Sequence, residues 1–435
     1  MLRNIVIICL LAASMPGKGV PAQKTGGRAA QKARNELGRL SKYDYSRLLG
    51  QQEYRYLGFI GQNYQRLYMY FTRAEKDTAD AALYHVEGAS RVRENVCNFV
   101  GSIRLKRIDR NDNEGFRSLD RYRITGEYSL REDERQQGAG RFAGKVTVDF
   151  YVYEDSVYFD DLFLNMSDGY CNNSFEGKWT SFKTKASKKA NWGLFRIPDS
   201  DALDVGECEF MVADKYKRNG WEIYSATVGD SNILKISLVE DAVDEERREW
   251  WQGKNEVRQH CKGEMLNNST FGVKVYRNGA LVQQIVCPID SVQPGDDACG
   301  EAWFNDVTFD GHNDLIVSTS RKTFGTTARF DCYTWNEQQQ AYVHIPSYSL
   351  IPAPSPSAMG RCIYGYKELA EGKYVEQKYV FRNGVFVLHA ALYVDHSGEK
   401  NEHYREVRME NGREITVKDT YNNEDYSPEW NFLPF

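Results

Sequence analysis

The stretch "VTVDFYVY", residues 146–153, alternates between apolar and polar side chains along most of its length. The apolar residues at its alternate positions are Val146, Val148, Phe150 and Val152. Successive side chains of a β-strand point to opposite faces, so these four share one face of an extended chain. A period of two is typical of a strand buried on one face and solvated on the other. The stretch therefore predicts an antiparallel sheet in the first half of the chain.

Turn residues punctuate the rest of the chain. Glycines separate short apolar runs in residues 54–197, and four Asn-Gly pairs follow at Asn219, Asn278, Asn383 and Asn411. Asn-Gly supplies the positive φ angles that a two-residue hairpin turn needs. The pattern predicts an all-β chain with two antiparallel β domains, each sandwich-like or barrel-like, and several hairpins in the second.

The composition divides the 435 residues into four parts. We expect a signal peptide at 1–22, a basic leader at 23–50, and an N-terminal β domain at 51–197. The leader should be solvated and partly helical, or else a basic arm for an anionic surface. A Pro/Asp-rich break precedes a C-terminal β domain at 207–435. The length agrees with about two to three domains.

The N-terminus has the features of a secretory signal. Arg3 precedes an apolar run at residues 5–13, and Val20-Pro21-Ala22 resembles a cleavage site. We therefore expect an exported protein, periplasmic or secreted. No later stretch approaches the length of a spanning helix, which predicts the lack of a transmembrane anchor. The net charge of -5 makes nucleic acid an unexpected partner.

Cysteine usage agrees with export. Removal of Cys9 with the signal leaves eight cysteines: Cys97, Cys171, Cys208, Cys261, Cys287, Cys299, Cys332 and Cys362. An even number in an oxidising compartment predicts disulfide bonds. A bridge between Cys287 and Cys299 would close a loop rich in Pro, Gly and Asp, although pairing of both elsewhere stays open.

The most specific chemical signal is "FNDVTFDGHNDLIV", residues 304–317. Calcium takes six to eight oxygen ligands, which a tight acidic loop with a glycine can supply. The predicted metal-binding residues are Asp306, Thr308, Asp310, His312 through its carbonyl, and Asp314. The predicted cofactor is thus a structural calcium ion. The alternative is an ordinary polar turn without an ion, because Asp, Asn and Gly are common in turns.

Residues 306–315 resemble the integrin-type, FG-GAP-like calcium loop D-x-[DN]-x-D-G-x-x-D-L, with Thr308 in place of Asn or Asp. With the strands that follow, at 315–321 and 330–357, the order over residues 208–395 resembles bacterial periplasmic lysozyme-inhibitor-like proteins. The resemblance implies a protein partner such as a muramidase. Inhibitors of related fold insert a Ser-Gly-x-Tyr loop into their target. The nearest stretch here, residues 397–401, has no tyrosine.

The first half is similar to an uncharacterised β-rich domain of bacterial secreted proteins. The similarity covers residues 54–197 and depends on "YLGFIG" (56–61), "YSLRE" (128–132), "GAGRFAG" (138–144) and "FEGKW" (175–179). This resemblance implies no chemistry.

Enzyme motifs are missing from the sequence. It has no Gly-x-Ser-x-Gly elbow, His-Glu-x-x-His or phosphate-binding glycine loop. His396 and His403 bracket an expected hairpin, which would either bind zinc or form a solvated turn. These features favour a calcium-stabilised binding protein, lysozyme-inhibitor-like, with a protein or cell-wall-related partner. The alternatives are a cell-envelope hydrolase that uses scattered carboxylates and a structural surface component. The oligomeric state stays open.

Overall fold

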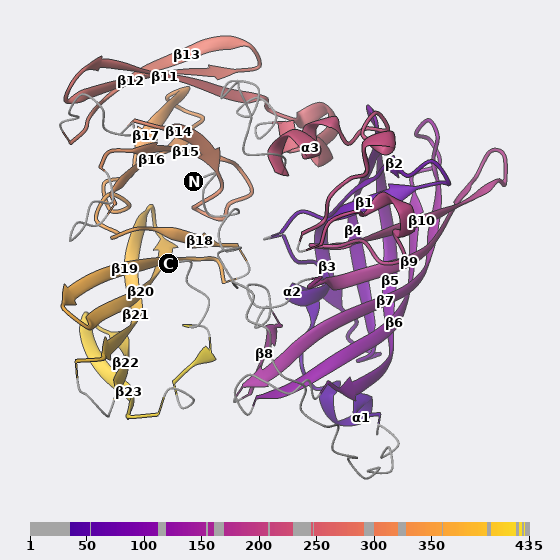
Figure 1. Cartoon of the computed structure of the whole chain (residues 1–435), viewed down its shortest axis with the longest axis horizontal. Helices are drawn as coiled ribbons and strands as arrows, with labels where there is room; N and C mark the ends of the chain where they lie inside the picture. The colour runs from indigo at the N-terminus through magenta and orange to yellow at the C-terminus, as the bar shows by residue number, and fades with distance from the viewer. Residues whose placement is uncertain are drawn as a thin grey trace, which may run out of the picture.

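The structure is a computed structural model. It describes residues 35–430 except 53, 112–118, 154, 161–168, 208, 229–244, 247, 291–299, 321–327, 359, 398–401, 423–425 and 429. Antiparallel sheets with a few short helices make up the chain, which confirms the predicted all-β fold. Indigo-to-magenta strands form one body in Figure 1, and orange-to-yellow strands form another. The predicted signal peptide lies outside the described residues. Within these ranges, no helix has the length and apolarity needed to cross a membrane.

The N-terminal body is one antiparallel sheet that closes on itself. Its strands are β1 (Leu57–Ile60), β2 (Gln65–Arg66), β3 (Tyr68–Lys76), β4 (Leu83–Val92), β5 (Asn95–Arg110), β6 (Asp120–Glu132), β7 (Gly140–Tyr153), β8 (Ser156–Phe159), β9 (Asn172–Ser181) and β10 (Ser187–Leu194). Their order is β2-β1-β10-β9-β7-β6-β5-β4-β3, with β8 on β7. The Leu67 amide between β2 and β3 donates to the Gly58 carbonyl at 2.9 Å. Because the chain runs through Leu67 directly from β2 into β3, the two end strands of the sheet meet and the sheet curls into a barrel.

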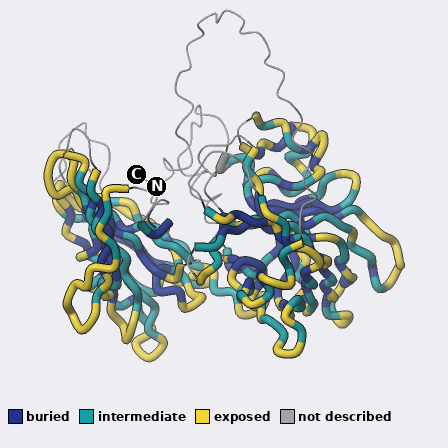
Figure 2. Tube along the Cα trace, turned by 90° about the horizontal axis from the view of Figure 1, so that it is seen from below, coloured by how far each residue is buried: buried dark blue, intermediate teal, exposed yellow. Residues whose placement is uncertain are grey.

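The barrel interior is a packed apolar core. Three residues of the predicted face are fully buried and the fourth packs against the same cluster: Val146, Val148, Phe150 and Val152. The rings of Phe175 and Trp192 stack inside, with centroids 4.9 Å apart. Figure 2 shows buried residues along the strands and exposed residues at the turns. The expected strand face is thus confirmed as the core face.

The leader differs from the expectation of a solvated segment. Its described part holds two short helices, α1 (Leu37–Leu40) and α2 (Ser46–Leu49). Leu40, Tyr45 and Leu49 are buried in the barrel core, and the Tyr45 hydroxyl donates to the Leu40 carbonyl at 2.9 Å. The apolar residues between the basic ones therefore pack with the barrel, which the charge pattern alone concealed.

The Asn219-Gly220 pair does not form the predicted hairpin turn. It stands between the 3-10 helix η3 (Asp214–Tyr216) and α3 (Glu222–Val228), after the 3-10 helix η2 (Asp201–Leu203). Gly220 alone of the pair has positive φ, +87°. Trp221 next to it is buried against Leu57 and Phe59 of the barrel. Packing of this tryptophan, rather than the local turn preference, determines the structure here.

Two buried arginines join the barrel to the segment that follows it. The guanidinium of Arg66, which is 1% exposed, lies 4.3 Å from the Trp221 ring and 4.5 Å from the Tyr68 ring. Its Nη2 forms an ion pair with Glu246 at 3.1 Å. Stacking on aromatic rings and pairing with a carboxylate suit the planar, weakly hydrated guanidinium.

Arg91 on β4 repeats this arrangement one strand away. Its guanidinium lies 4.0 Å from the centre of the Tyr68 ring and 5.5 Å from the centre of the Trp250 ring. Its Nη1 approaches Glu245 at 3.4 Å. We call Arg66, Arg91, Tyr68, Trp221 and Trp250 the arginine–aromatic cluster. The cluster attaches Trp221 and the Glu245, Glu246 and Trp250 side chains to the strands of the barrel.

We predict that Arg66→Lys lowers the free energy of unfolding by about 2 kcal/mol, because an ammonium neither stacks on the rings nor tolerates burial as well. Urea denaturation measures the loss. Arg73→Lys on β3 is the matched control, since Arg73 is half exposed and pairs with Glu75 in solvent. A similar small effect, within about 0.5 kcal/mol, at both positions would contradict a structural role for the cluster.

The C-terminal body contains three antiparallel sheets. Their strands are β11 (Gln259–Asn267), β12 (Thr270–Arg277), β13 (Ala280–Pro288), β14 (Ala302–Asn305), β15 (Asp314–Ser318), β16 (Phe330–Asn336), β17 (Ala341–His344), β18 (Ser355–Ser357), β19 (Cys362–Ala370), β20 (Lys373–Arg382), β21 (Val385–Asp395), β22 (His403–Glu410) and β23 (Arg413–Thr420). Each sheet runs in sequence order: β11 to β13, β14 to β17, and β18 to β23. Asn278, Asn383 and Asn411 have positive φ and lead into the expected hairpins, so three of the four predicted turns are confirmed.

A buried carboxylate lies within the six-stranded sheet. Glu376 on β20 is 2% exposed, and its Oε2 has no hydrogen-bond partner. Burial raises the pKa of Glu376 to about 8. Between pH 4.5, the ordinary pKa of a glutamate, and about pH 8, Glu376 is therefore protonated in the folded protein and ionised in the unfolded chain. Because the folded state binds this proton more tightly than the unfolded state, the contribution of Glu376 to the free energy of unfolding falls as the pH rises from about 4.5 to about 8.

We predict that Glu376→Gln, which has no proton to lose, becomes more stable than the natural chain as the pH rises. The difference in the free energy of unfolding should grow by about 3 kcal/mol between pH 5 and pH 8. Urea denaturation at both pH values measures it. A difference that does not change with pH would mean that Glu376 titrates alike in both states.

Candidate metal-binding loop

The acidic loop connects two paired strands of the four-stranded sheet. β14 ends at Asn305, and β15 begins at Asp314, directly opposite in the antiparallel register. Asp314 is 1% exposed, whereas Asp310 and His312 are exposed. The β-structure thus places the predicted ligands within one hairpin loop, with one carboxylate at its buried base.

Backbone amides of the loop bind its own carboxylates. Asp306 accepts from the Asp310 amide at 3.2 Å and from the Gly311 amide at 2.9 Å. Asp314 Oδ2 accepts from the amides of Val307 and Thr308 at 3.1 and 3.0 Å. Gly311 has φ +91°, which a glycine adopts without strain. These bonds fix the loop conformation before any ion is considered.

Thr308 is the least satisfied residue of the loop. Its side chain is 7% exposed, and its hydroxyl has no hydrogen-bond partner. A buried hydroxyl without a partner costs about 1–3 kcal/mol. The resemblance predicts a metal ligand at this position, and the Thr308 hydroxyl has no other partner.

A further carboxylate, Glu249, approaches the loop from the segment beside the arginine–aromatic cluster. It is 6% exposed, precedes the 3-10 helix η4 (Trp250–Asn255), and accepts a hydrogen bond from the Asn313 amide. Burial raises the pKa of Glu249 to about 7; His312 opposes the shift and Asp306 adds to it. Sequence reasoning missed Glu249, because nothing local relates it to a loop so far along the chain.

The loop concentrates negative charge out of water. Burial raises the pKa of Asp314 to about 7, and repulsion from Asp306 and Asp310 adds to the shift. Burial is also the main cause of the raised pKa of Asp306. A cation would favour the ionised form of all three carboxylates.

Carboxylates alone do not make a metal centre here. Among the described residues, no three His, Cys, Asp or Glu side chains form a group that could hold a metal ion. A calcium ion in this loop would therefore depend on other oxygens, such as the Thr308 hydroxyl and the His312 carbonyl, together with water. The five predicted residues are brought into one loop, and calcium stays a prediction.

The other predicted sites are not assembled. His396 Nδ1 lies 3.8 Å from Glu402 Oε1. His403 Nε2 lies 2.5 Å from Asp419 Oδ1, so each imidazole faces its own carboxylate. Cys287 is a buried thiol whose Sγ is 3.3 Å from the Tyr333 hydroxyl. Cys299, the other half of the predicted bridge, lies outside the described residues, so the Cys287–Cys299 bridge stays a prediction.

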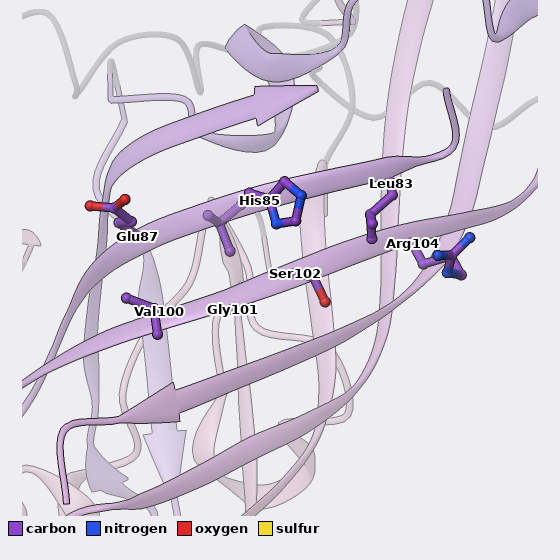
Figure 3. A pocket seen from close by; sticks show the side chains of 8 residues that line it. Leu83, His85, Glu87, Val100, Gly101, Ser102 and Arg104 are labelled. Carbon is purple, nitrogen blue, oxygen red and sulfur yellow. The ribbon is translucent and has the colours of Figure 1, made fainter. Parts of the chain in front are cut away.

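An open hollow of about 580 Å³ lies on the outer face of β4 and β5. Figure 3 shows His85 and Glu87 from one strand and Ser102 and Arg104 from the other along it. His85 and Arg104 already bind Asp77 and Asp80, at 2.8 and 2.6 Å. The hollow is shallow, and its charged groups are engaged, so it does not resemble a catalytic site.

Comparisons with known proteins leave the family open. No protein-family model matches the chain, and no curated protein matches it. Among solved structures, the chain is similar to one described as "Structure of a Xanthomonas Type IV Secretion System related protein". The two are 19% identical with a TM-score of 0.28, and the similarity covers 38% of this chain and 88% of that chain. A TM-score this low transfers neither fold nor function.

We predict that Thr308→Val has opposite effects with and without calcium. In chelator, removal of the unpartnered hydroxyl should raise the free energy of unfolding by about 1 kcal/mol. In calcium, loss of a ligand should weaken binding by about tenfold. Thr319→Val in a neighbouring connection is the matched control, because the Thr319 hydroxyl already donates to the Arg329 carbonyl at 3.2 Å. Equal changes in both buffers would contradict a ligand role for Thr308.

Proposed function

We propose that the protein is an exported binding protein whose 306–314 loop is fastened by calcium. The supporting observation is the buried, unpartnered Thr308 hydroxyl within a loop whose base holds the buried Asp314 carboxylate. A cation would satisfy this hydroxyl and lower the repulsion between Asp306, Asp310 and Asp314. Its role would be structural, because the loop joins two core strands and lies against Glu249.

The proposed partner is a protein of the cell wall's metabolism, such as a muramidase. The lysozyme-inhibitor-like order of residues 208–395 supports this class of partner. Residues 398–401, within the stretch nearest to the inhibitory loop, lie outside the described residues. Export would also place the cysteines in an oxidising compartment, where disulfide bonds form.

The test of the ion is stability with and without calcium. At a calcium concentration 100-fold above the dissociation constant, binding should raise the free energy of unfolding by about 2.7 kcal/mol. Thermal unfolding in calcium, magnesium and chelator measures the effect. Asp310→Ala should lose it and keep its far-ultraviolet circular dichroism.

Asp290→Ala is the matched control, since Asp290 is exposed and pairs with Arg329 at 2.9 Å. A melting temperature that is the same in calcium and in chelator would exclude the ion. The partner is tested separately, by turbidity assays of muramidases on cell walls. Lack of inhibition across muramidase families would contradict this choice of partner but not the calcium site.

A further inference from the structure

One face of the six-stranded sheet carries a row of polar and aromatic side chains. Tyr366, Glu376, Leu392 and Glu406 stand directly opposite one another on β19, β20, β21 and β22. Residues opposite one another in an antiparallel sheet point to the same face. We call this the Glu376 face.

The end of the chain covers this face. The Tyr426 ring lies 4.8 Å from that of Tyr404, and the buried Trp430 ring lies 5.9 Å from that of Tyr364. The Ser427 amide donates to Glu406 Oε2 at 3.0 Å. Two ring contacts and one hydrogen bond thus attach the tail residues, namely Tyr426, Ser427 and Trp430.

The fit between tail and sheet leaves two strong hydrogen-bonding groups unused. Glu376 Oε2 lacks a partner on the sheet side, and the Trp430 indole N–H lacks one on the tail side. Both side chains are 2% exposed. A buried donor and a buried acceptor that leave each other unsatisfied make this contact weaker than its apolar area suggests.

Charge indicates which ligand would fit better. Glu376 and Glu406 are both acidic and buried, and among the described tail residues the Ser427 amide donates to Glu406. Burial alone accounts for the raised pKa of Glu376, without an opposing contribution from a cation. A lysine or arginine next to an aromatic ring would satisfy the carboxylate and retain the ring contacts.

We propose that the Glu376 face is a binding site for a segment of a partner protein in which an aromatic side chain stands beside a lysine or arginine. In the structure, the tail residues occupy this site in place of the partner segment. This proposal rests on the binding function proposed above and names its surface and ligand chemistry. The covalently attached tail competes at high effective concentration, so the partner must displace it.

The test uses the full chain and two labelled peptides, acetyl-Tyr-Ser-Pro-Lys-Trp-amide and acetyl-Tyr-Ser-Pro-Glu-Trp-amide. Ser427→Pro removes the amide that binds Glu406 and should loosen the tail without altering the sheet. Fluorescence polarisation should show the lysine peptide binding Ser427→Pro about tenfold more tightly than the natural chain. The lysine peptide should also bind this variant about tenfold more tightly than the glutamate peptide.

Adding Glu376→Gln to Ser427→Pro should abolish the preference for lysine. Adding Glu414→Gln is the matched control, because Glu414 accepts from Tyr393, which lies on the opposite face of the same sheet. Trp430→Ala serves as a second tail variant, and circular dichroism confirms the folding of each. Failure of both peptides to bind both tail variants, or a preference that survives Glu376→Gln, would overturn the proposal.

The two proposals are separable because the titrations are done in calcium and again in chelator. Peptide binding without calcium-dependent stabilisation would exclude the ion and leave the Glu376 site. Calcium-dependent stabilisation without peptide binding would do the reverse. Equal binding of an uncharged oligosaccharide would also contradict the assignment to a basic peptide.

Discussion

Stacking of buried guanidinium groups on aromatic rings is the interaction that attaches the segment after the barrel to the barrel strands. Arg66 and Arg91 extend from the barrel strands and contact Trp221, Trp250 and the paired glutamates Glu245 and Glu246. A buried guanidinium without a carboxylate partner is strongly destabilising. Here Glu246 pairs with Arg66 and Glu245 with Arg91. Glu249 directly precedes Trp250, so the same attachment places a carboxylate beside the acidic loop.

This dependence links a structural cluster to the candidate site. The loop supplies most of its own hydrogen bonds, as Asp306 and Asp314 show, but its charge balance includes Glu249 from outside the hairpin. Position and charge are therefore set by different parts of the chain. A change at Arg91 could alter the loop's electrostatics without touching any residue that lies in it.

Local signals predicted the parts of the structure that local physics determines. Alternation identified the core face at Val146, and positive φ at Asn278 confirmed a hairpin. Acidic spacing located the loop in the same way. Barrel closure at Gly58, the contacts of Arg66 and the role of Glu249 join residues far apart in sequence, and no short pattern encodes them. The hairpin predicted at Asn219-Gly220 is wrong, because the neighbouring Trp221 packs against the barrel.

The closed barrel also determines where the protein can associate through its backbone. Most strands of the barrel pair on both sides, so an incoming strand finds little unpaired backbone along them. The open sheets of the C-terminal body do have ends, and β23 is exposed along most of its length. Its mixed charges and irregular register at Glu406 are features that discourage fibre-like growth from such an edge.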